Sequence, residues 1–279
     1  MSQTNVSGAV FKLTQGTVPM LVSMPHIGTH IPPQLQAGYT ARALQLEDTD
    51  WHLGQLYDFL PAMGASVLQP RYSRYVIDLN RPPDDAPMYP GTSNTELCPT
   101  RFFTGDALYL EGCAPDAAAR LQRRITYWQP YHDGLATELQ RLVQTHGYAL
   151  LWDAHSIRSA IPWLFEGTLP ALNIGTASGD SAHAAIAKAV LEACRIKGTY
   201  SHVLNGRFKG GYITRHYGRP DTHVHAVQLE MCQNQYMEEI PPFAYDAALA
   251  AQVQPTLRAM LQAALNAAAA LYSGGSDVR

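Results

Sequence analysis

The sequence has little cysteine and little charge, and it contains no long apolar run. The four cysteines among its 279 residues are scattered, without a CxxC pair, so we expect free thiols in a reducing compartment. Charged residues make up 15% of the chain and hydrophobic residues 46%, a balance typical of a large buried core and opposite to that of a disordered chain. No uncharged apolar stretch approaches the ~20 residues that span a bilayer.

The chain also lacks an excess of positive charge. Its formal net charge is −3 at pH 7, whereas proteins that bind nucleic acids or anionic membranes usually present a basic face. We therefore expect neither kind of partner. Residues 1–13 have no charged start and no apolar centre of the kind found in signal peptides, so we expect a cytoplasmic protein.

Three short catalytic or binding motifs are missing as well. Without GxSxG there is no nucleophile elbow of a serine hydrolase, although Ser156 and Ser159 remain conceivable nucleophiles. Without GxxxxGK[ST] there is no phosphate-binding loop. Without HExxH, any metal site must be assembled from residues that lie far apart in the sequence.

What the chain does contain is an alternation of short apolar segments and longer helical ones. We expect strands at residues 18–24, 65–68, 75–79, 148–153 and 224–230, and helices at residues 50–63, 117–146 (interrupted near Pro130), 181–195 and 245–271. This order predicts an α/β fold with a mainly parallel, mixed sheet and helices on both faces. We expect one domain over residues 1–279, with a disordered N-terminus at 1–14 and a flexible tail at 272–279.

Polar residues follow three of the predicted strands directly. His26, His155 and Glu230 each come at the end of an apolar run. The carboxyl ends of parallel strands meet at one crevice, so we expect these side chains to converge there. Neutral imidazoles are the commonest zinc ligands, and a catalytic zinc site typically uses three protein ligands and one open position.

A third ligand must come from elsewhere, and the acidic segment Glu47-Asp48-Thr49-Asp50 is the nearest candidate. It precedes a predicted helix, where a carboxylate could equally serve as a cap. Asp153, two residues before His155, is suited to orienting a ligand imidazole.

Arginines among amides, hydroxyls and glycines form the second group of candidates. A guanidinium binds a carboxylate through two parallel hydrogen bonds, so such a group suits a small substrate with more than one carboxylate. The alternative for any single arginine is a surface ion pair. The candidates for substrate binding are Arg81, Arg158, Asn205, Arg207 and Arg215.

Six segments of the chain together resemble the N-formylglutamate deformylase family of bacterial histidine degradation. The resemblance extends from about residue 15 to residue 260 and is carried by PHIGTHIP (25–32), DTDWH (48–52), RYSRYVIDLNR (71–81), DAHSIRS (153–159), NGRFKGGYITR (205–215) and QLEM (228–231). It implies a phosphorylase/hydrolase-like fold similar to zinc carboxypeptidases. It also implies hydrolysis of N-formyl-L-glutamate to formate and L-glutamate.

The resemblance further implies a role for each site residue. His26 and His155 match the two histidine ligands of related metallopeptidases by strand position, and Glu230 matches the catalytic base. We choose Asp50 as the acidic ligand, with Asp48 and Glu47 as substitutes and His30 as a more distant option. The implied cofactor is one divalent ion; the ligand set favours zinc, with iron, cobalt and manganese as alternatives.

Two other functions stay open at this point, as does the oligomeric state. One is a related metallo-amidohydrolase that acts on another N-acyl amino acid or a peptide-like amide. The other is a non-catalytic protein that binds a dicarboxylate, which would need the arginines but neither a metal nor Glu230.

Overall fold

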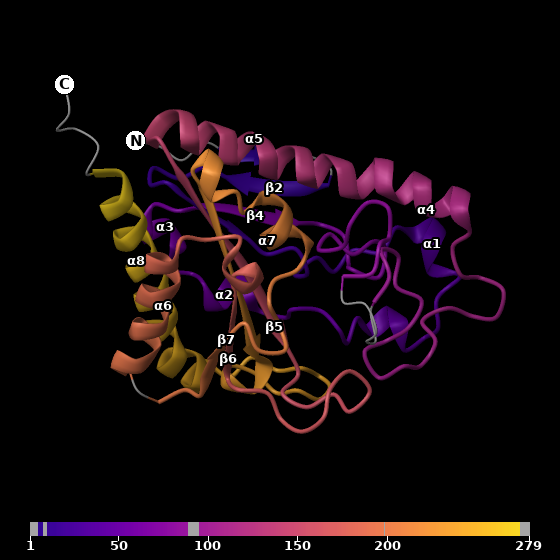
Figure 1. Cartoon of the computed structure of the whole chain (residues 1–279). Helices are drawn as coiled ribbons and strands as arrows, with labels where there is room; N and C mark the ends of the chain where they lie inside the picture. The colour runs from indigo at the N-terminus through magenta and orange to yellow at the C-terminus, as the bar shows by residue number, and fades with distance from the viewer. Residues whose placement is uncertain (1–4, 8–9, 89–94, 198, 274–279) are drawn as a thin grey trace.

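The computed structural model describes residues 5–7, 10–88, 95–197 and 199–273. These residues build one eight-stranded mixed sheet with helices on both faces (Figure 1). Across the sheet the strand order is β1-β2-β4-β3-β5-β8-β6-β7. The strands are β1 (Asn5–Ser7), β2 (Phe11–Thr14), β3 (Met20–Ser23), β4 (Ser66–Pro70), β5 (Ala149–Ile157), β6 (Leu172–Gly175), β7 (His202–Leu204) and β8 (Val224–Cys232).

The helices differ greatly in length. The α-helices are α1 (Pro33–Gln36), α2 (Leu53–Leu56), α3 (Leu60–Met63), α4 (Ala117–Arg123), α5 (Gln129–His146), α6 (Ala184–Lys197), α7 (Tyr212–Tyr217) and α8 (Ala247–Ser273). A π-helical turn, η2 (Arg124–Trp128), joins α4 to α5, so that the three form one long helical run along the molecule (Figure 1). Four 3-10 turns complete the set: η1 (Ala43–Gln45), η3 (Ala177–Gly179), η4 (Pro220–Thr222) and η5 (Gln233–Gln235).

The centre of the sheet is parallel. Strand β3 pairs in parallel with β4 and β5, and β5 pairs in parallel with β8 over nine residues. The flanking strands β2 and β6 pair antiparallel with β4 and β8. The carboxyl ends of β3, β5 and β8 therefore meet at one edge of the sheet, which is where α/β proteins bind ligands.

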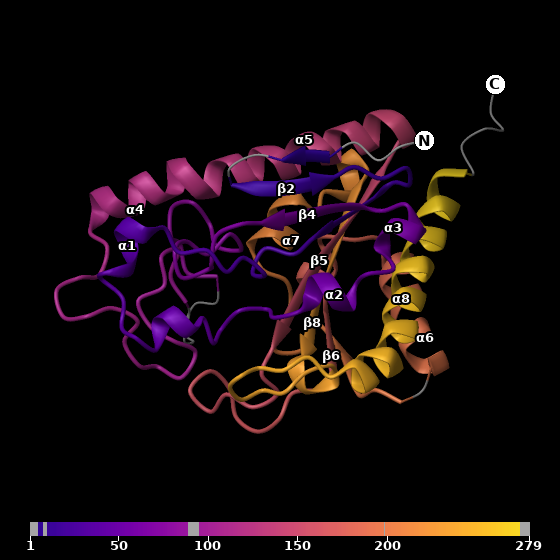
Figure 2. The same cartoon turned by 180° about the vertical axis from the view of Figure 1, so that it is seen from behind.

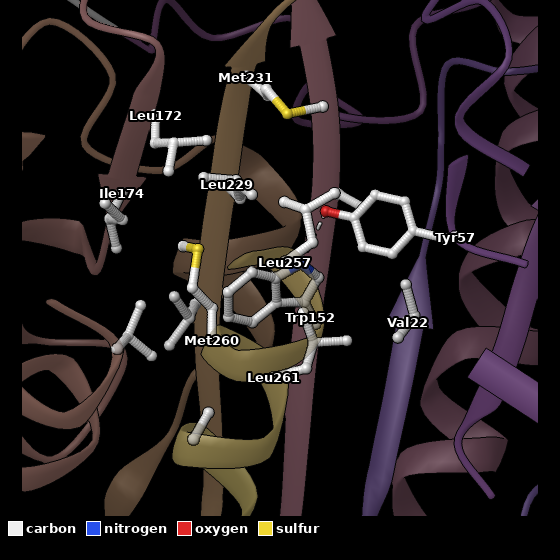
Figure 3. Packing of buried hydrophobic residues seen from close by; sticks show 14 of the residues in the cluster. Val22, Tyr57, Trp152, Leu172, Ile174, Leu229, Met231, Leu257, Met260 and Leu261 are labelled. Carbon is white, nitrogen blue, oxygen red and sulfur yellow. Dashed lines mark hydrogen bonds between the residues drawn. The ribbon is translucent and has the colours of Figure 1, made fainter. Parts of the chain in front are cut away.

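Two hydrophobic cores cover the two faces of the sheet. On one face α6 and α8 lie side by side and pack on Trp152, Leu229 and their neighbours (Figures 2 and 3). On the other face α5 packs on Leu151 and Ala226. All nine residues of β5 are buried, as expected for a central strand covered on both sides.

Side chains alternate between these faces along β5. Trp152 and Ala154 belong to the core under α8, and Leu151 belongs to the core under α5. Asp153 and His155 continue the series of Leu151, so they point to the α5 side of the sheet at the carboxyl end of the strand. This alternation places both polar candidates of β5 on the same face of the sheet, at the carboxyl end of the strand.

Most predicted elements are present, and two are wrong. Residues 75–79 are buried but form turns rather than a strand, because Asp78 Oδ1 accepts the N–H of Asn80 and the N–H of Val76 bonds to Ser73. The helix predicted at 50–63 is only the two short helices α2 and α3, since His52 has φ 59° and Pro61 lies in the first turn of α3.

The predicted interruption of the long helix near Pro130 is confirmed, because the π-helical turn η2 ends at Trp128, two residues before Pro130. A proline lacks the N–H that a regular helix needs, and a π-turn accommodates that loss. All four cysteines are free, as expected. Among the described helices, none has the length and apolar character needed to cross a membrane.

The chain ends differ from expectation where they are described. Residues 5–7 and 11–14 form β1 and β2 instead of a disordered N-terminus, because β2 pairs with β4 at the edge of the sheet. Residues 272 and 273 belong to α8, while 1–4, 8–9 and 274–279 lie outside the described residues.

Candidate active site

His26, Asp50 and His155 converge at the carboxyl edge of the sheet. His26 follows β3, His155 lies on β5, and Asp50 comes from the loop before α2. Their side chains are almost fully buried, with exposed fractions of 5%, 1% and 3%. One ligand atom of each lies within 4.8 Å of the others, which makes them a possible metal-binding group.

The outer nitrogens of the two imidazoles each lie beside a carboxylate. His26 Nε2 lies 2.7 Å from Asp78 Oδ1, and His155 Nε2 lies 3.1 Å from Asp153 Oδ1. Such carboxylates fix the orientation of a ligand histidine in zinc sites. Each imidazole consequently turns its Nδ1 toward Asp50.

The distances within this trio fit a tetrahedral ion. The two Nδ1 atoms are 3.2 Å apart, and Asp50 Oδ2 lies 3.7 Å from that of His26 and 3.3 Å from that of His155. A tetrahedral ion with ligand distances of about 2.0–2.1 Å separates its ligand atoms by about 3.3 Å. Asp50 Oδ2 is buried and accepts no hydrogen bond from the described residues. An orphaned oxygen of this kind is consistent with a missing cation partner.

The charge of the surroundings also suits a cation. Burial, reinforced by the positive charge of Arg74, lowers the pKa of His26, so this imidazole is neutral and can act as a ligand. Arg74 Nη1 lies 3.3 Å from His26 Nδ1, and Arg74 Nη2 donates to Asp78 Oδ2 at 2.6 Å. Arg74 interacts electrostatically with the carboxyl groups of Asp50, Asp78 and Glu230, all of which are buried, so negative groups outnumber this guanidinium.

Glu230 lies opposite His155, because the two residues are partners in the β5–β8 register. Burial raises the pKa of Glu230 to about 8, and the negative charge of Asp50 adds to the rise. A carboxyl group with a pKa near neutrality can both accept and return a proton under physiological conditions. Glu230 is therefore suited to general acid–base work beside the trio.

The trio and Glu230 line one cavity together with three arginines, one of which is Arg74. Arg81 and Arg207 border the cavity, and an apolar wall is formed by Phe103, Ile157, Leu164 and Phe208. Arg207 Nη2 reaches Leu164 O at 3.4 Å, and Arg81 Nε donates to Thr95 O at 2.9 Å. The cavity thus combines a buried acid–base group with positive charge at its border.

A family model described as N-formylglutamate amidohydrolase matches residues 18–237. The chain belongs to this family. It is 52% identical over 256 residues to an N-formylglutamate deformylase from Pseudomonas aeruginosa and 51% identical over 256 residues to one from Pseudomonas putida. Each of these alignments covers 92% of this chain and 96% of the relative. The resemblance drawn from the six sequence segments is confirmed.

Two solved structures share the fold of this family member. An N-formylglutamate amidohydrolase from Ralstonia eutropha JMP134 superposes with a TM-score of 0.78 at 23% identity, covering 95% of this chain and 99% of that one. A gene product from Agrobacterium tumefaciens superposes with a TM-score of 0.67 at 17% identity, covering 95% and 97%. At these identities the likeness concerns the fold alone.

The other acidic candidates for a third ligand point elsewhere. Asp48 Oδ1 accepts from Arg158 at 2.9 Å, and Asp48 Oδ2 accepts from the Tyr75 hydroxyl at 2.9 Å. Glu47 pairs with Arg42 at 2.6 Å. His30 packs against Tyr72, with the ring centroids 5.3 Å apart. These contacts leave Asp50 as the acidic residue of the trio.

Three of the predicted substrate-binding residues do not line this cavity, as far as the described residues show. Arg158 is paired with Asp48. Asn205 holds the backbone near η3, where its Oδ1 accepts the N–H of Thr176 at 2.8 Å. Arg215 lies on α7 and donates from Nε to Gly210 O at 2.8 Å. The glycine-rich segment 205–215 groups Asn205 and Arg215 with Arg207 in sequence, but among these three only Arg207 lines the cavity in the part of the chain that the structure describes.

Sequence reasoning missed Arg74 and the roles of Asp78 and Asn80. Asn80 Nδ2 lies 2.9 Å from His155 Nε2, and its Oδ1 accepts the N–H of Ile213 at 2.8 Å. The available signal was Asp78 inside the apolar run at 75–79, with Arg74 and Asn80 directly before and after the run. Buried groups of this kind require partners, which would have pointed to a polar site rather than a strand.

The geometry gives no support to a serine nucleophile. The side chain of Ser156 points away from that of His155 along β5, and Ser156 Oγ lies 2.7 Å from the Tyr236 hydroxyl. Ser159 Oγ donates to Glu239 Oε2 at 2.8 Å. Neither hydroxyl makes an imidazole contact among these hydrogen bonds, so neither has the base that a serine nucleophile needs.

Proposed function

We propose that this chain hydrolyses N-formyl-L-glutamate to formate and L-glutamate and that it needs one divalent ion to do so. The names of its Pseudomonas relatives support the substrate. The observation that carries the mechanism is that Glu230 lies opposite His155 in the cavity that the His26, Asp50 and His155 trio lines.

The trio would hold the ion through His26 Nδ1, Asp50 Oδ2 and His155 Nδ1, the three atoms that face one another. When bound, a divalent ion supplies Lewis-acid polarisation of the formyl carbonyl and of the attacking water. Two imidazoles and one carboxylate favour zinc. Asp78 and Asp153 keep the imidazoles in the orientation that this requires.

Glu230 acts as the general base. Its carboxylate takes a proton from the water whose oxygen attacks the formyl carbon. The carbon–nitrogen bond then breaks, and Glu230 returns the proton to the departing amine nitrogen of glutamate. The pKa of about 8 that burial gives this carboxyl group suits both halves of the transfer.

Arg81 and Arg207 bind the carboxylates of the substrate. Both border the cavity, and N-formylglutamate brings two carboxylates, one on the α-carbon and one on the side chain. Guanidinium groups bind such anions through paired hydrogen bonds. The apolar wall formed by Phe103, Ile157, Leu164 and Phe208 excludes water and so strengthens these contacts.

From the resemblance we further infer that the chain works in bacterial histidine degradation in the cytoplasm. We also infer that it is a single domain and that its fold is similar to that of zinc carboxypeptidases.

Product analysis with the zinc-loaded protein tests the proposal. Incubation with N-formyl-L-glutamate should release formate and glutamate in equal amounts, and N-acetyl-L-glutamate should react far more slowly. Faster hydrolysis of another N-acyl amino acid would overturn the substrate assignment. Full turnover after exhaustive chelation, with no ion detected, would overturn the metal-dependent mechanism.

A further inference from the structure

Two side chains from the segment after β8 form hydrogen bonds to the backbone on either side of Asp50. Gln233 Nε2 donates to the carbonyl oxygen of Thr49 at 3.0 Å, and the Tyr236 hydroxyl lies 2.8 Å from the carbonyl oxygen of Trp51. These are the carbonyls of the residues immediately before and after Asp50. The position of the Asp50 backbone is therefore fixed from a segment almost two hundred residues away in the sequence.

The same two side chains meet at Ser156, the neighbour of His155. Ser156 Oγ lies 2.7 Å from the Tyr236 hydroxyl and 3.4 Å from Gln233 Nε2. A carbonyl only accepts, so the Tyr236 proton goes to Trp51 O and Ser156 donates to the Tyr236 oxygen. The hydrogen bonds form one connected network that links the strand of one ligand to the loop of another.

Asp50 needs such support more than the two histidines do. The histidines have side-chain hydrogen-bond partners of their own, Asp78 for His26 and Asn80 for His155. Asp50 Oδ2 accepts no hydrogen bond from the described residues, although the side chain is 1% exposed. The backbone is what positions this carboxylate, and the Asp50 N–H itself donates to His26 O at 3.1 Å.

We propose that Ser156, Gln233 and Tyr236 form a clamp whose role is to position Asp50 for metal binding. All three are buried, with exposed fractions of 3% or less, so an unmade hydrogen bond would be costly and the network stays formed. The inference rests on the proposed function. Residues that orient metal ligands typically change metal affinity by about 10–100-fold when they are replaced.

The test compares Tyr236→Phe with Tyr57→Phe. Both replacements remove one buried tyrosine hydroxyl, since Tyr236 is 0% and Tyr57 is 2% exposed. The Tyr57 hydroxyl accepts from Trp152 Nε1 at 3.5 Å in the core under α8, and none of the hydrogen bonds described above joins it to a clamp residue (Figure 3). The Kd for Zn²⁺ is measured by competition with a chromophoric chelator, and thermal unfolding of the metal-free proteins is followed in parallel.

We expect Tyr236→Phe to raise the Kd for Zn²⁺ about tenfold or more and Tyr57→Phe to leave it unchanged. The visible absorption of the Co²⁺-loaded protein should also change in Tyr236→Phe alone, because these bands respond to ligand geometry. A merely structural role would lower the unfolding temperature of both variants and alter neither readout. Should Tyr236→Phe fail to fold, Gln233→Met removes the hydrogen bond to Thr49 O and carries the same expectation.

The clamp is overturned if the folded variant binds Zn²⁺ within twofold of the unmodified protein and gives the same Co²⁺ spectrum. Failure of the proposed function looks different. In that case the unmodified protein itself binds no Zn²⁺ or does not hydrolyse N-formylglutamate. This result is seen before any variant is compared, and without metal binding the clamp has no ligand to position.

Discussion

His155 and Glu230 are directly opposed on the parallel strands β5 and β8. The distance between a metal-ligand candidate and the base is thus set by the pairing of two central strands and not by a loop. Two residues earlier, Asp153 and Gln228 form the next pair with the same orientation. A site built on paired strands holds its groups more rigidly than one built on loops.

Replacing Glu230 by Gln should lower kcat by about a hundredfold to ten-thousandfold, the range that general acid–base groups contribute. Gln keeps the size and polarity of the side chain but cannot take the proton. Steady-state kinetics of the zinc-loaded variant on N-formylglutamate provides the measurement.

Metal content distinguishes a lost base from a lost ion in this variant. Glu230→Gln should still contain about one zinc ion per chain by elemental analysis. Near-normal turnover with zinc present would mean that another group acts as the base.

The choice of Asp50 over Asp48 as the third ligand gives a second prediction. Both carboxylates are buried, but Asp50 faces His26 and His155 whereas Asp48 binds Arg158. Asp50→Asn should lose zinc during purification, and Asp48→Asn should retain about one ion per chain, with lower stability from the unpaired Arg158. Retention of zinc by Asp50→Asn together with its loss in Asp48→Asn would reverse the assignment.

The sequence is most informative where a strand delivers a side chain. His26, His155 and Glu230 follow apolar runs, and strand pairing brings them together, so their convergence could be predicted from the pattern. Loop contributions could not. Arg74 and Asp78 enter the site through turns whose hydrogen bonds depend on distant residues, such as the bond from the Asp78 N–H to Leu97 O.

The arginines show the same limit. Arg207 and Arg215 are eight residues apart in one glycine-rich segment, yet only Arg207 lines the cavity, among the residues that the structure describes. Arg215 lies on α7, and the turn at Gly210, with φ 118°, comes between the two. The sequence shows that this segment contains arginines, but the path of the backbone decides which of their side chains lies at the cavity.

Acid should destabilise the protein partly through His132, which is not a member of the trio. Burial lowers the pKa of His132 to about 3, and its ring nitrogens bond to Leu79 O and the Tyr217 hydroxyl. The unfolded chain takes up a proton at this histidine below pH about 6.5 while the folded protein does not. Its stabilising contribution is therefore complete above pH 6.5 and declines as the pH falls toward 3.

The comparison of His132→Gln with the unmodified protein isolates this effect. Between pH 7 and pH 5 the unmodified protein should lose on the order of 2 kcal/mol more unfolding free energy than the variant. Urea unfolding of both metal-free proteins at the two pH values measures the difference, in which the titrations of all other groups cancel. Equal losses in the two proteins would contradict the prediction.

Selectivity for a dicarboxylate should depend on Arg207. This arginine borders the cavity, so a substrate with a neutral side chain loses the ion pair that a side-chain carboxylate would form with it. N-formylglutamine should therefore fall about a hundredfold below N-formylglutamate in kcat/KM, which corresponds to about 2.7 kcal/mol. Arg207→Met should narrow this gap by lowering kcat/KM for N-formylglutamate while changing that for N-formylglutamine little.

Arg215→Met is the matched control, because Arg215 belongs to the same segment but lies on α7 outside the cavity lining. This variant should keep the full difference in kcat/KM between the two substrates. Equal kcat/KM values for the two substrates in the unmodified enzyme would show that the pocket recognises the formyl group alone. A gap that closes in Arg215→Met but not in Arg207→Met would show that Arg215 on α7 binds the side-chain carboxylate instead.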